Sequence, residues 1–157
     1  FLEKDYAHLK ELDVFSIDID GIDYYVAKKF LEMGFNPKII IAEYNSSFGH
    51  ERAVTVPYHS DYVKHVNTGG YPSYYFGCSL QSYKNLFKKY GYRFVTVESC
   101  GINAFFIKED QFHSYFIESL GEGRQFGDNI SMYFTHKMSN EQLFNTMKDF
   151  ELNEVTD

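Results

Sequence analysis

The most constraining feature of the sequence is a strand, turn, helix and strand pattern between residues 13 and 42. The run DVFSIDI at residues 13–19 is short and rich in β-branched residues, which is typical of a strand. Gly21 then allows a turn, and apolar residues follow at the spacing of one helix face until Gly34. The apolar run IIIA at residues 39–42 is typical of a strand buried on both faces. The pattern predicts a βαβ unit with a right-handed crossover.

Further elements are expected after this unit. An amphipathic stretch over residues 79–90 predicts a helix. Two strands are predicted at residues 92–98 and 103–108, and the short connection between them, which contains Gly101, favours an antiparallel hairpin. Residues 46–77 are rich in glycine, proline and tyrosine, so we expect a long loop of the kind that forms lids and binding sites.

The C-terminal part of the chain is predicted to be helical. One helix is expected over residues 110–120, and a second begins at Ser139, where Ser139 and Gln142 fit a capping box. Between the two helices, residues 121–129 are predicted to form a loop.

Length and composition suit one globular domain. The chain has 157 residues, of which 44% are hydrophobic and 24% are charged, and a chain of this length can bury a substantial core. We therefore predict a single α/β domain over residues 1–157, with a mixed sheet of about four strands. Because the sequence begins at Phe1 rather than Met, we also expect it to be a piece of a longer protein.

Charge and composition exclude several classes of protein. The net charge is -7, so the chain lacks the basic surface that binds phosphate backbones, and no nucleic-acid partner is expected. No apolar run approaches the roughly 20 residues that span a bilayer. Cys78 and Cys100 are too few for a disulfide framework or a four-cysteine metal site. We expect a soluble, cytoplasmic protein that acts on a small molecule and has no membrane partner.

Acidic and amide side chains gather where the first two predicted strands end. Asp18 and Asp20 lie at the end of the first strand, and Glu43 and Asn45 lie at the end of the second. The carboxyl ends of parallel strands meet at one edge of a sheet, where ligands bind. Oxygen ligands of this kind suit Mg²⁺, Ca²⁺ or Mn²⁺ rather than zinc. The sequence therefore predicts a site for a divalent cation.

Some of these residues have a second interpretation. Asp20 or Asp23 is also suited to cap the helix that follows. The tyrosines of residues 71–75 are suited to line a ligand pocket, or equally to cover an exposed sheet face. Three histidines of the long loop are candidates for a general base, although solvated loop histidines are common: His50, His59 and His65. The sequence assigns no catalytic residue.

Four segments are similar, in order, to a known family. They are DVFSIDIDG at 13–21, IAEYN at 41–45, GYRFV at 91–95 and GINAFF at 101–106. Together they resemble the C-terminal half of FkbM-like, S-adenosylmethionine-dependent methyltransferases. The resemblance implies a partial Rossmann-like fold in which these segments are strands four to seven of seven, with the last two antiparallel.

The resemblance also divides the chain. It makes residues 1–108 the methyltransferase-like part and residues 109–157 a helical C-terminal extension. The glycine-rich loop that holds the cofactor in the family is absent from this sequence. The resemblance therefore implies a truncated methyltransferase that binds S-adenosylmethionine weakly or not at all by itself.

A related group of methyltransferases bears on the predicted cation site. The metal-dependent catechol-type enzymes hold Mg²⁺ with an aspartate at the end of strand four and an Asp-Asn pair at the end of strand five. Asp18, Glu43 and Asn45 look like the matching positions. Asp20 stands where the FkbM-like motif has a glutamate. In that mechanism the cation lowers the pKa of a substrate hydroxyl and orients it toward the methyl donor.

The missing strands one to three have a further consequence. They leave the strand at residues 13–19 as an open edge, which is a template for pairing with another chain. We therefore expect a homodimer or a higher oligomer formed through residues 13–19.

Two other functions fit the same residues. Asp18-Ile-Asp20 after an apolar strand also suits the metal-binding pair of nucleotide-sugar glycosyltransferases, which use Mn²⁺ to hold a diphosphate. The loop at 46–77 would suit a non-catalytic module that binds a small ligand.

Overall fold

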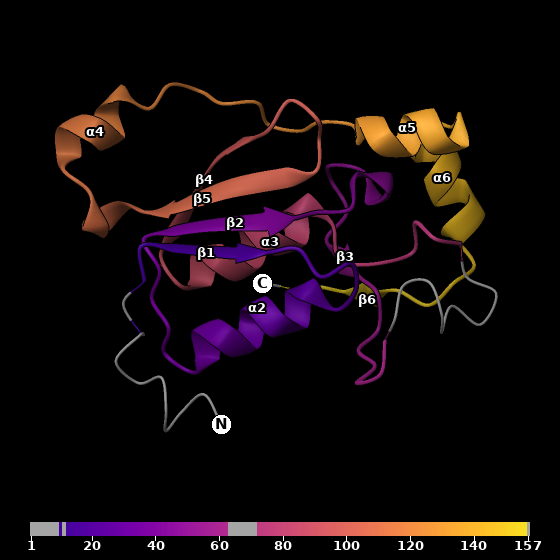
Figure 1. The fold of residues 1–157 in the computed structure, drawn as a ribbon, viewed down its shortest axis with the longest axis horizontal. Helices are drawn as coiled ribbons and strands as arrows, with labels where there is room; N and C mark the ends of the chain where they lie inside the picture. The colour runs from indigo at the N-terminus through magenta and orange to yellow at the C-terminus, as the bar shows by residue number, and fades with distance from the viewer. Residues whose placement is uncertain (1–9, 11, 63–71, 157) are drawn as a thin grey trace.

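The centre of the molecule is a mixed sheet of four strands. The computed structural model describes residues 10, 12–62 and 72–156. The strands are β1 (Val14–Ile17), β2 (Ile39–Glu43), β4 (Tyr92–Val97) and β5 (Asn103–Lys108), in the spatial order β1-β2-β5-β4. β1 and β2 are parallel, and β5 is antiparallel to both β2 and β4. The protein is therefore α/β with a mixed four-stranded sheet, as predicted (Figure 1).

The predicted βαβ unit is present. Helix α2 (Asp23–Glu32) connects β1 to β2, and the parallel register places Val14 beside Ile39 and Ile17 beside Ala42. The ring of Phe15 in β1 stacks on Phe30 in α2, with 4.0 Å between ring centroids. This contact packs the helix against the edge strand of the sheet.

Helices α2 and α3 (Leu80–Lys89) pack on the same face of the sheet (Figure 1). Alternate residues of the strands, such as Ile40 and Phe106, are fully buried beneath them. On the other face of β2, Ile39 and Ile41 are only half-buried. The expectation that this strand is buried on both faces is therefore wrong, because the described helices cover one face only.

The helix and hairpin that follow are close to the prediction. Ser79 is the N-cap of α3, and its hydroxyl accepts a hydrogen bond from the Ser82 amide at 3.2 Å. β4 and β5 form an antiparallel hairpin, with an irregularity in the register between Phe94 and Thr96. The connection turns at Gly101, which has a φ of +68°.

The predicted long loop at 46–77 contains short regular elements. A 3₁₀ turn, η2 (Ser46–Phe48), follows β2, and the strand β3 (Val54–Thr55) pairs antiparallel with β6 (Asn153–Glu154) near the C-terminus. Because β6 returns to the body of the molecule, the C-terminal extension is not purely helical. Residues 63–71 lie outside the described part of the chain, so His65 and Tyr71 are not placed.

The C-terminal helices differ from the prediction in number. The single helix predicted at 110–120 is wrong, because extended backbone at Phe112 separates η3 (Glu109–Gln111) from α4 (Ser114–Ser119). Helix α5 (Ile130–His136) was not predicted. Helix α6 (Asn140–Met147) begins with the predicted capping box of Ser139 and Gln142. Among the described residues, no helix is long and apolar enough to cross a membrane.

Candidate metal site

Three acidic side chains meet where β1 and β2 end. The parallel register sets Ile17 beside Ala42, so Asp18 and Glu43 follow at the same edge of the sheet. Asp18, Asp20 and Glu43 each offer a carboxylate oxygen, and these oxygens lie within 4.8 Å of one another. Asp18 is exposed, Asp20 is half-buried and Glu43 is buried. The structure thus brings together three of the four residues that the sequence predicts as ligands; we call them the carboxylate cluster.

Asn45, the fourth predicted ligand, is fully buried and makes three hydrogen bonds to the backbone. Its amide nitrogen donates to the carbonyls of Tyr74 at 2.7 Å and Phe76 at 2.9 Å. Its Oδ1 accepts from the Ser47 amide at 3.0 Å. These bonds fasten the segment before α3 to the end of β2. Ligation of a cation by Asn45 stays a prediction.

The turn that carries Asp18 and Asp20 is held by Asp23. The two carboxylate oxygens of Asp23 accept hydrogen bonds from the amides of Ile19 and Gly21, each at 2.8 Å. Between these amides, Asp20 has a φ of +54°, a left-handed conformation that aspartate tolerates better than most residues. The capping role considered for Asp20 or Asp23 is wrong, because the N-cap of α2 is Ile22 and Asp23 binds amides that precede the helix.

Asp23 is also the most buried acidic residue at this edge. It is 1% exposed, and its burial raises the pKa of its carboxyl group, although the hydrogen bonds from Ile19 and Gly21 act in the opposite direction. A buried carboxylate is tolerated when its oxygens are hydrogen-bonded, and both oxygens of Asp23 are.

Tyr62 packs against the turn at Gly21. A Cβ atom added to Gly21 would lie 2.9 Å from Cδ1 of Tyr62, so a larger residue at this position would force the Tyr62 ring to shift. The Tyr62 hydroxyl donates a hydrogen bond to the carbonyl of Tyr75. Burial raises the pKa of Tyr62 to about 12, and the charges of Asp23 and Asp20 act in the same direction. Nothing in the sequence distinguishes Tyr62 from its neighbouring tyrosines.

The other candidates from the long loop are placed differently. His50 and His59 are exposed, and Nε2 of His50 lies 3.7 Å from Oε1 of Glu51. Tyr75 belongs to a buried cluster with Phe48, and Tyr74 packs against this cluster at its border. In the described part of the loop, these tyrosines therefore support the interior.

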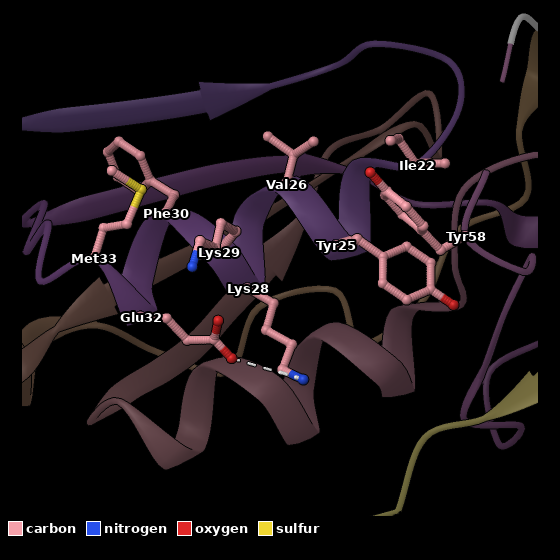
Figure 2. Close-up of a pocket in the computed structure, with 9 residues that line it drawn as sticks. All are labelled: Ile22, Tyr25, Val26, Lys28, Lys29, Phe30, Glu32, Met33 and Tyr58. Carbon is pink, nitrogen blue, oxygen red and sulfur yellow. Dashed lines mark ion pairs between the residues drawn. The ribbon is translucent and has the colours of Figure 1, made fainter. Parts of the chain in front are cut away.

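A groove of about 520 Å³ runs along the outer side of α2. Figure 2 shows Val26, Phe30 and Met33 along one side of the helix, and Lys28 paired with Glu32 at 3.7 Å. None of the three residues of the carboxylate cluster lines this groove.

Comparisons of the chain with protein-family models, with curated proteins and with solved structures gave no match. Function is therefore inferred from the geometry of the chain and from the family resemblance of its four segments.

Proposed function

We propose that the protein is the C-terminal half of a methyltransferase-like domain and that its carboxylate cluster binds a divalent cation, Mg²⁺ or Mn²⁺. The observation that carries the proposal is the meeting of Asp18, Asp20 and Glu43 within 4.8 Å at the ends of two adjacent parallel strands. In open α/β sheets this is the edge at which ligands bind.

The arrangement of the strands supports the methyltransferase part of the proposal. A parallel βαβ unit, a helix and an antiparallel hairpin follow one another along the chain. The FkbM-like resemblance implies the same sequence of elements, with the last two strands antiparallel. The partial Rossmann-like fold is thus the fold that we propose for residues 1–108.

The distances and charges within the carboxylate cluster support the binding of a divalent cation. Three carboxylates within 4.8 Å repel one another when all are ionised, and a divalent cation offsets this repulsion. Oxygens that share one Mg²⁺ lie roughly 3 to 4 Å apart, because each is about 2.1 Å from the ion. Small movements of the three side chains would therefore complete such a site. When bound, the cation would lower the pKa of a substrate hydroxyl.

A titration with Mn²⁺ tests the cation site. We expect the protein to bind Mn²⁺, measured by the loss of the electron paramagnetic resonance signal of the free ion. Glu43→Gln and Asp18→Asn each remove a charged ligand and are expected to weaken binding by at least about tenfold. Asp13→Asn is the matched control, because Asp13 lies before the amino end of β1 and pairs with Lys38 at 2.7 Å. Equal binding by all four proteins would contradict the proposal.

Calorimetry with S-adenosylmethionine tests the other part of the proposal. The 157-residue chain has no glycine-rich cofactor loop, so we expect no binding at micromolar concentrations. A longer chain that includes an upstream strand, glycine-rich turn and helix is expected to bind the cofactor. Micromolar affinity of the 157-residue chain itself would overturn its assignment to the half without the cofactor loop.

A glycosyltransferase-like function is the second candidate. The presence of both Asp18 and Asp20 in the carboxylate cluster favours it, since an Asp-x-Asp pair can hold Mn²⁺ and a diphosphate. Thermal unfolding distinguishes the two functions. Uridine diphosphate added with Mn²⁺ should raise the melting temperature above that with Mn²⁺ alone only if the protein is glycosyltransferase-like.

A further inference from the structure

We propose that Asp23 is the positioning residue of the cation site, and that its buried carboxylate fixes the turn that carries Asp18 and Asp20. The inference rests on the proposed cation binding and adds a residue outside the carboxylate cluster. The two oxygens of Asp23 bind the amides of Ile19 and Gly21, each at 2.8 Å.

The two hydrogen bonds come from the residues directly before and directly after Asp20, one of the proposed cation ligands. Ile19 and Gly21 are the immediate neighbours of Asp20, and Ile19 also follows Asp18 directly. Asp20 has a φ of +54°, a left-handed conformation that is uncommon for residues other than glycine even though aspartate tolerates it better than most. The hydrogen bonds from the amides of Ile19 and Gly21 to Asp23 hold the backbone on both sides of Asp20.

Asp23 is itself held firmly. It is the first residue of α2 and is 1% exposed, so its side chain is surrounded by protein. A negative charge in the first turn of a helix is stabilised by the helix dipole. The ring of Tyr62 packs against Gly21 in the same turn. The turn therefore lies between a helix and a half-buried ring, and Asp18 and Asp20 would already be in place when a cation binds.

The substitution Asp23→Asn tests this role. Asparagine has nearly the same shape but only one side-chain acceptor, so one of the two amides loses its partner. We expect affinity for Mn²⁺ to fall by about 10- to 100-fold, the range typical of residues that orient metal ligands. Tyr92→Phe is the matched control. It removes a buried hydrogen bond of 2.6 Å to Pro37 O, before the amino end of β2, and should leave Mn²⁺ affinity unchanged.

The outcomes separate this inference from the proposed function. If the unaltered chain and Asp23→Asn bind Mn²⁺ equally, or if Asp23→Asn and Tyr92→Phe weaken binding equally, the positioning role is overturned and cation binding stands. If the unaltered chain binds no Mn²⁺, both fail.

Hydrogen exchange measured by nuclear magnetic resonance gives a test that needs no variant. We expect the amide protons of Ile19 and Gly21 in the unaltered protein to exchange slowly, because both are bonded to a buried carboxylate. Exchange of both amides at the rate of open loops would overturn the inference even if Asp23→Asn fails to fold.

Discussion

Tyr44 shows how a single buried polar group joins distant parts of this chain. Its hydroxyl donates to the carbonyl of Gly127 at 2.6 Å and accepts from the amide of the same residue at 3.1 Å. Tyr44 is 1% exposed, and burial raises the pKa of its hydroxyl to about 12. The residue therefore fixes the segment before α5 to the carboxyl end of β2, the strand that ends with Glu43.

The tyrosines predict a loss of stability in alkali. An unfolded tyrosine loses its proton near pH 10, whereas burial raises the pKa of Tyr24, Tyr44 and Tyr62 to about 12 in the folded protein. Between these pH values the unfolded state binds fewer protons, so the free energy of unfolding falls as the pH rises. Urea denaturation at about pH 9 and pH 11 measures this fall. Tyr44→Phe should make the fall smaller, and an unchanged fall would contradict the role of Tyr44.

The polar residues near the carboxyl ends of β1 and β2 also show what the sequence could and could not predict about the candidate site. The meeting of Asp18, Asp20 and Glu43 could be predicted because the carboxyl ends of parallel strands meet at one edge of the sheet. The hydrogen bonds of Asp23 and Asn45 could not be predicted, because they depend on the backbone conformation of the turns beside them. Residue type alone does not separate Asp23, which binds backbone amides, from the three carboxylates of the cluster.

At the scale of elements, the β4–β5 hairpin contacts the segment that precedes α5. A Cβ atom added to Gly101 would lie 2.2 Å from the carbonyl oxygen of Asp128. The amide of Ile130 donates a hydrogen bond to the carbonyl of Cys100 at 3.1 Å. The turn of the hairpin and the start of α5 therefore fit together through their backbones.

Alanine in place of glycine tests this contact. Gly101 has a φ of +68° and Gly77 has a φ of +63°, but an added Cβ at Gly77 meets nothing within 4 Å. Gly77→Ala should cost only the conformational penalty, about 1–2 kcal/mol of unfolding free energy. Gly101→Ala should cost clearly more, because a backbone carbonyl must also move. Equal costs in urea denaturation would show that the two segments do not pack closely.

The elements also differ in how far sequence patterns predict them. The βαβ unit, α3 and the hairpin have apolar patterns that match one packed face, and all were predicted. Helix α5 was not, because only Met132 is buried among its residues and a helix with one buried residue has no apolar stripe. β3 and β6 have two residues each and are defined by a pairing between segments about a hundred residues apart.

At the scale of the whole molecule, β1 is an edge strand of the four-stranded sheet. The amide of Ile39 donates to the carbonyl of Asp13 at 3.0 Å. Because backbone groups alternate in direction along a strand, those of Val14 and Ser16 face away from β2. No strand in the described part of the chain pairs with this side of β1. We propose that a second copy of the chain does so, which gives a homodimer.

A substitution at this edge tests the dimer. Val14 is 49% exposed, and Val14→Lys places a charge on the edge, which discourages pairing of strands. We expect a dimer for the unaltered chain and a monomer for Val14→Lys by size-exclusion chromatography with light scattering. Tyr115→Lys is the control, since Tyr115 lies in α4 and is 76% exposed. A monomeric unaltered chain would contradict the proposed dimer.

The cation site is tested most directly by anomalous diffraction from crystals of the protein soaked in Mn²⁺. We expect one strong anomalous peak with carboxylate oxygens of Asp18, Asp20 and Glu43 at about 2.0–2.6 Å from it. The Asp23 carboxylate should remain bonded to the amides of Ile19 and Gly21. Crystals that show no peak at the three carboxylates, or a peak only elsewhere on the surface, would contradict the proposed site.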